Sequence, residues 1–124
     1  MRRVVITGIA TKTSLGEDYT SILTKLIQGI SATRVMPEWS DIEGLNTQLA
    51  APIDDFSLPA HYTRKRTRAM GRVAKLACYT TEKALVDADL LDKKEILEQA
   101  RTGVAYGSCS GSTAPLCDLA RAPR

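Results

Sequence analysis

Apolar positions change their spacing along the chain, and each spacing predicts a different element. Residues 3–7 form a β-branched run that ends at Gly8, which is typical of a strand buried on both faces of a parallel sheet. Apolar side chains then recur at helical spacing over 19–26, with Asp18 before them and Gly29 after them. The chain therefore opens, by prediction, with a strand, a loop and an amphipathic helix.

The periodicity fades after this helix and then returns. Residues 30–61 show no sustained period, and we expect loops there with one short strand at 48–51. Helical spacing resumes over 63–89, where small residues line one continuous face suited to close packing, and again over 92–100. A strand at 103–107 follows and runs into a Gly/Ser loop. This alternation of strands and helices predicts an α/β fold.

The net charge of +3 is concentrated in one segment. The span between Phe56 and Glu82 contains no Asp or Glu but holds six basic residues, namely Arg64, Lys65, Arg66, Arg68, Arg72 and Lys75. Without these six, 17 basic and 14 acidic residues become 11 and 14, a net charge of −3. Such a local excess of positive charge indicates an acidic partner.

The spacing of these cations also favours a binding surface. On one continuous helix Lys65, Arg68 and Arg72 would share a face, and they open the helix, where the dipole disfavours cations. The partner could be a protein, a phosphate group or a nucleic acid. Nucleic acid is disfavoured, because only Tyr62 and Tyr79 supply aromatic rings among the cations.

One motif suggests a nucleophile. Residues 107–111 have the G-x-nucleophile-x-G spacing of a strand-to-helix elbow, with Cys109 at the nucleophile position. A thiol nucleophile needs a base, and the single histidine, His61, precedes it in the chain, whereas in that fold the base follows. We therefore favour a structural Gly-rich loop, and a small hydrolase using Cys109 stays an alternative.

Other features exclude several classes of site. Cysteines at 78, 109 and 117 match neither a zinc site nor a redox pair, which predicts reduced thiols in the cytoplasm and no metal. Residues 4–8 lack the further glycines of a nucleotide-binding loop. No apolar segment approaches the length of a membrane span.

Several motifs together resemble the condensing enzymes of fatty-acid and polyketide synthesis, and the chain is identified as similar to a β-ketoacyl-acyl carrier protein synthase. The match extends over almost the whole chain, and its order and spacing are more specific than any single motif. The segments that carry it are residues 3–9, 14–16, 55–56, 64–70, 103–108 and 111–113. Ala10 and Lys12 depart from the family pattern, which suggests a divergent branch.

The resemblance implies a partial thiolase-like fold, the opening section of the family's N-terminal half, with a mixed sheet and packed helices. Family members form homodimers or heterodimers. They move an acyl group from a carrier-protein thioester to a Cys, decarboxylate malonyl-carrier protein and condense the two, and two histidines stabilise the negative charge. We expect residues 1–124 to end before that Cys, to contain no catalytic residue and to be inactive alone.

The resemblance also implies a partner. Lys65 and Arg68 match basic positions that dock the acyl carrier protein in the bacterial enzymes, and helical geometry adds Arg72. Substrates ride on the phosphopantetheine arm of that partner, so no cofactor of the enzyme's own is implied. The alternative from another class is a non-enzymatic domain whose basic helix binds an acidic protein or nucleic acid.

Overall fold

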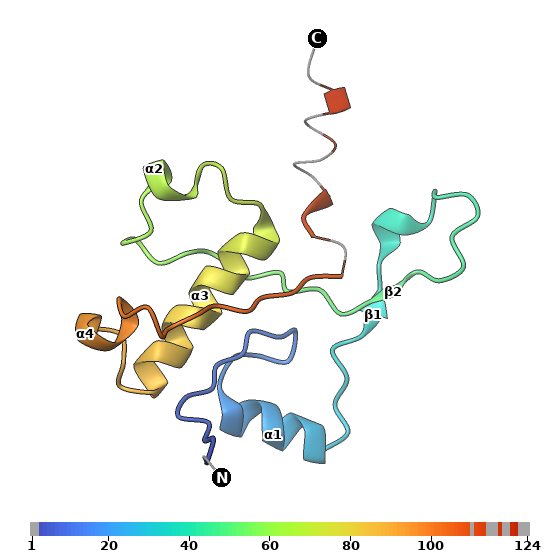
Figure 1. Ribbon diagram of the computed structural model, residues 1–124. Helices are drawn as coiled ribbons and strands as arrows, with labels where there is room; N and C mark the ends of the chain where they lie inside the picture. Colours follow the sequence, from blue (N-terminus) through green and yellow to red (C-terminus); the bar gives the residue numbers. More distant parts are fainter. Residues whose placement is uncertain (1–2, 110, 114–116, 118–119, 122–124) are drawn as a thin grey trace. The chain divides into compact units, whose positions relative to one another are not determined.

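The computed structural model describes residues 3–109, 111–113, 117 and 120–121 (Figure 1). The chain forms two compact units. The first unit combines residues 1–10 with 58–124, and the second unit consists of residues 11–57. Of the described helices, none has the length and apolar character needed to cross a membrane.

The second unit begins with the predicted helix. Helix α1 spans Tyr19–Ile27. Asp18 caps it, because its carboxylate accepts a hydrogen bond from the backbone N–H of Ser21 at 2.7 Å. Gly29 follows with φ of 69°, a left-handed conformation that glycine adopts without strain. The predicted helix is confirmed, and neighbouring residues set both of its ends.

A two-stranded antiparallel sheet completes the second unit. Strand β1 (Arg34–Val35) pairs with β2 (Leu49–Ala50), with Arg34 opposite Ala50. The 3₁₀ helix η1 (Pro37–Trp39) lies between them in the chain. The short strand predicted at 48–51 is confirmed. Its partner β1 was not predicted, because two residues are too few to show an alternating pattern.

The first unit is built on helix α3, which spans Arg72–Asp87. Helix α2 (Arg64–Thr67) precedes it, and α4 (Lys94–Leu97) follows it. The prediction of one continuous helix over 63–89 is wrong, because the chain breaks between α2 and α3. Gly71 sits at this break in an extended conformation, with ψ of 172°, and glycine costs about 1 kcal/mol in a helix interior. The second predicted helix, 92–100, is likewise reduced to α4.

The C-terminal end of α3 is packed closely against the opening of the chain. A Cβ atom at Gly8 would lie 2.8 Å from both the Cβ and the backbone N of Ala88, and closer still to the carbonyl oxygen of Ala84. The backbone N–H of Ile9 donates to the Asp87 carboxylate at 2.8 Å. The small face of α3 therefore allows close approach, as its sequence predicted.

The strands predicted at 3–7 and 103–107 are not formed. Strands need hydrogen-bonded neighbours, and in the described part of the chain none pairs with these segments. Their apolar side chains stay on the surface, with Val4 94% and Val104 87% exposed. Among the described residues, the buried hydrophobic side chains are Met36 in the second unit and Tyr79 in the first.

Candidate functional site

The three cations predicted to dock a partner lie in residues 64–72, which we call the basic segment. Lys65 belongs to α2, Arg68 is the C-cap of that helix, and Arg72 is the first residue of α3. All three side chains are exposed. The prediction that they share one helix face is wrong, because the break at Gly71 separates Arg72 from the other two. Whether they dock a partner stays a prediction.

A serine from a distant loop fixes the point where the basic segment meets α3. The backbone N–H of Val73 donates to the hydroxyl oxygen of Ser112 at 3.0 Å. This bond satisfies one of the donors that a helix start leaves without a partner inside the helix. This contact agrees with the structural Gly-rich loop predicted from the sequence, although the residue that the loop contacts could not be foreseen.

A polar cluster lies at the other end of the basic segment, and we call His61, Tyr62 and Glu82 the His–Tyr–Glu cluster. The Nε2 atom of His61 is 2.8 Å from the Oε2 atom of Glu82. The two rings of His61 and Tyr62 are 4.6 Å apart between centroids. The Tyr62 hydroxyl shares its single proton between the carbonyl oxygen of Cys78, 3.2 Å away, and the carboxylate of Glu82.

Burial and the neighbouring charge set the ionisation of this cluster. Burial raises the pKa of Tyr62 above its ordinary value, and hydrogen bonding to the Glu82 carboxylate raises it further. The hydrogen bonds from Tyr62 and His61 hold the pKa of Glu82 below its usual range. At neutral pH the cluster therefore pairs an ionised carboxylate with a neutral phenol. Glu82 was not predicted from the sequence, where its one signal is that it ends the acid-free span.

The elbow that a Cys109 nucleophile would require is not formed. Residues 103–107 are not a strand, and Cys109 is exposed as a free thiol. His61, the only histidine of the chain, is engaged with Glu82. In the part of the chain that the structure describes, no cluster of His, Cys, Asp or Glu could hold a metal ion. These observations disfavour the hydrolase alternative.

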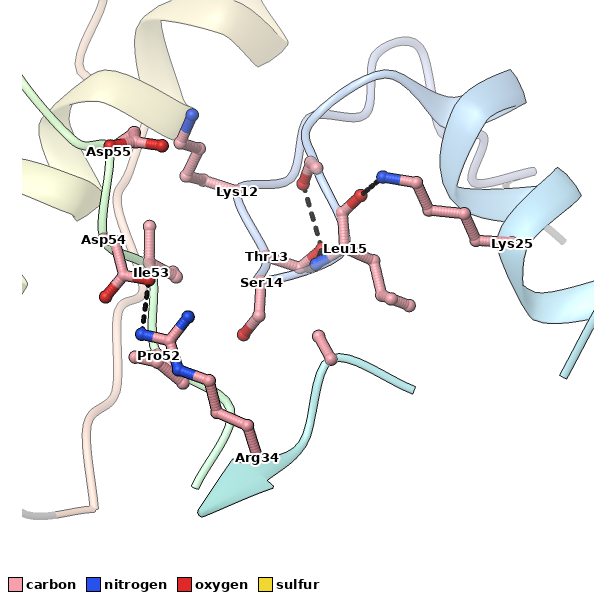
Figure 2. Close-up of a pocket in the computed structure, with 12 residues that line it drawn as sticks. Lys12, Thr13, Ser14, Leu15, Lys25, Arg34, Pro52, Ile53, Asp54 and Asp55 are labelled. Carbon is pink, nitrogen blue, oxygen red and sulfur yellow. Dashed lines mark hydrogen bonds and ion pairs between the residues drawn. The ribbon is translucent and has the colours of Figure 1, made fainter. Parts of the chain in front are cut away.

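The second unit contains a cavity of about 440 Å³ lined by the loop around Thr13, by Arg34 and by residues 52–55 (Figure 2). Two of its cations have acidic partners. The Arg34 guanidinium lies 2.6 Å from the Asp54 carboxylate, and the Lys12 ammonium lies 3.1 Å from Glu17. A third cation of the lining, Lys25, donates to the carbonyl oxygen of Leu15. Lys12, a departure from the family pattern, thus takes part in an ion pair.

Comparison with known proteins assigns the class. Residues 1–124 match the family described as Beta-ketoacyl synthase, N-terminal domain. The chain belongs to this family. Its structure also matches the crystal structure of a beta-ketoacyl synthase from Burkholderia phymatum, with a TM-score of 0.87 and 45% sequence identity over 97% of this chain and 29% of that one. The predicted family and the partial thiolase-like α/β fold are confirmed.

Curated relatives refine this assignment. The chain is 32% identical to 3-oxoacyl-[acyl-carrier-protein] synthase 1 of Haemophilus influenzae, over all of this chain and 30% of the relative. It is 29% identical to the chloroplastic 3-oxoacyl-[acyl-carrier-protein] synthase II of Arabidopsis thaliana, over 99% of this chain and 23% of the relative. The chain thus spans less than a third of the length of either relative.

Proposed function

We propose that this chain serves a 3-oxoacyl-acyl carrier protein synthase and that its basic segment docks the acyl carrier protein. One observation carries the proposal. Five exposed cations occupy nine consecutive positions, within a span that holds no acid from Phe56 until Glu82: Arg64, Lys65, Arg66, Arg68 and Arg72. The two curated relatives are named for an acyl carrier protein, the partner that the cations at Lys65 and Arg68 would meet.

The proposed reaction divides the work between docking and chemistry. An acyl group passes from the carrier thioester to a Cys thiolate, and the carrier leaves as a thiolate that takes a proton from water. Malonyl-carrier protein then loses CO₂, and its carbanion attacks the acyl-enzyme, which restores the Cys thiolate and gives 3-oxoacyl-carrier protein. This scheme requires two histidines, and the 124 residues contain one. We propose docking as the chain's own contribution, and we expect no condensation from it alone.

The wider setting follows from the family resemblance. We propose a dimer in the cytoplasm, acting on substrates held by the phosphopantetheine arm without a cofactor of its own. The resemblance supports the dimer. The odd number of cysteines, three, supports a reducing compartment.

Electrostatics favours a protein partner of distributed negative charge. Exposed ion pairs contribute about 0.2–1 kcal/mol each, so five cations give moderate affinity and fast association that depends on salt. A carrier protein that must be released after each transfer suits such an interface. A basic domain built for nucleic acid would more often interleave aromatic side chains for stacking.

Titration of isotope-labelled acyl carrier protein with the 124-residue chain tests the proposal. We expect chemical-shift changes confined to one acidic face of the carrier protein, with affinity that falls as salt rises. Unlabelled duplex DNA serves as the competitor. If DNA displaces the carrier protein only at a large excess, the result supports the proposal that the chain docks the carrier protein as part of a synthase. Tighter binding to DNA, with the steep salt dependence of phosphate contacts, would instead support the non-enzymatic basic domain.

A further inference from the structure

The residues just before the basic segment are tied to α3 by the His–Tyr–Glu cluster. Tyr62 and His61 lie immediately before Thr63, the N-cap of α2. They contact Cys78 and Glu82, which lie one helical turn apart on α3. At the far end, Ser112 holds the start of α3 through Val73.

Helix α2 is too short to fix its own position. It has four residues, and its N-cap Thr63 makes no side-chain capping bond. Isolated helices of this length are unstable in water, because nucleation costs more than so few hydrogen bonds return. Contacts outside α2 therefore set the position of Lys65 and Arg68 relative to α3, and the contacts of His61 and Tyr62 immediately precede the helix.

We propose that Glu82, acting through His61 and Tyr62, is a positioning residue that ties the residues before α2 to α3 and thereby sets where Lys65 and Arg68 lie relative to Arg72. This inference rests on the proposed docking function and deepens it. It identifies a carboxylate on α3, outside the basic segment, as a determinant of carrier-protein affinity.

Charge and position make opposite predictions for Glu82. As a negative charge beside a basic surface, Glu82 repels an acidic partner, so on charge alone any neutral replacement strengthens binding. As an acceptor for His61 and Tyr62, it keeps the cations in place, so a replacement that accepts no hydrogen bond weakens binding. Glutamine removes the charge and keeps an acceptor oxygen, whereas leucine removes both.

The test compares Glu82→Gln with Glu82→Leu in the 124-residue chain, using affinity for acyl carrier protein at several salt concentrations. We expect Glu82→Gln to bind as tightly as the native chain or slightly tighter. We expect Glu82→Leu to bind roughly threefold to tenfold more weakly, with a shallower salt dependence, because fewer cations reach the partner together. Glu98→Leu, at an exposed position after α4, controls for the loss of one charge and should bind no more weakly than the native chain.

A second pair of variants separates an effect on folding from an effect on the position of the cations. His61→Ala loses the contact with Glu82, whereas His61→Gln keeps a donor, so the glutamine variant should recover part of the affinity. Partial unfolding of Glu82→Leu would lower the fraction of binding-competent chain without changing the salt dependence of the folded remainder. Equal or tighter binding by Glu82→Leu overturns the positioning role while the docking function stands. Failure of the native chain to bind carrier protein overturns both.

Discussion

A variant with Lys65→Glu and Arg68→Glu together is expected to bind acyl carrier protein roughly tenfold more weakly than the native chain. Each exposed ion pair contributes about 0.2–1 kcal/mol, and reversal replaces that attraction with repulsion of similar size. Two reversals therefore reach about 1.4 kcal/mol, which corresponds to tenfold. Both side chains are exposed, so the free energy of unfolding should change little.

The matched control reverses two other exposed cations of the same unit, in Lys94→Glu with Arg101→Glu. This pair changes the net charge by the same amount outside the basic segment. Calorimetric titration at low and moderate salt should show a small loss for the control and a large, salt-sensitive loss for the Lys65 and Arg68 pair. Equal losses in both variants would mean that net charge alone, rather than the basic segment, attracts the carrier protein.

Gly8→Ala is expected to produce a large loss of stability from a single methyl group. Its Cβ atom would lie 2.8 Å from two atoms of Ala88 and closer to the Ala84 carbonyl oxygen, separations that packed carbon atoms do not tolerate. Two of the three obstructing atoms are backbone atoms, one in α3 at Ala84 and one at its C-cap Ala88, so they cannot move aside as a flexible side chain would. Overpacking of this kind costs about 1–3 kcal/mol. Thermal unfolding should shift downward by several degrees.

Gly103→Ala is the control for this prediction. Nothing lies within 4 Å of a Cβ atom at Gly103. The added methyl group restricts the unfolded chain and meets no obstacle in the folded one, so stability should be unchanged or slightly increased. If the two variants melted at the same temperature, the close packing of the chain opening against α3 would be refuted.

Local signals explain the part of the fold that the sequence predicted. Helix α1 begins at a carboxylate three residues from the amide it caps and ends beside a glycine, so neighbouring residues determine both ends. The long helical stretch at α3 also followed from its period. The break at Gly71 was overlooked because a single glycine inside a periodic segment is tolerated in many helices.

Non-local contacts explain the rest. The apolar runs at 3–7 and 103–107 signal burial against partners, yet periodicity does not say whether the partner strands lie within the chain. In the candidate site, the exposed cations were found from charge alone. The contact between His61 and Glu82 joins residues separated by 21 positions, and the cap from Ser112 joins residues separated by 39. No local pattern reports such pairings.

The most direct test of docking is a charge exchange between the two partners. The Lys65→Glu, Arg68→Glu variant is combined with carrier-protein variants in which one acidic residue at a time is changed to lysine. For each carrier-protein variant, affinity is measured for the four pairings of native or variant chain with native or variant carrier protein. If the basic segment contacts the carrier protein, at least one variant–variant pair will bind more tightly than the sum of the two separate losses in binding free energy predicts. Strictly additive losses for every acidic position of the carrier protein would contradict docking at the basic segment.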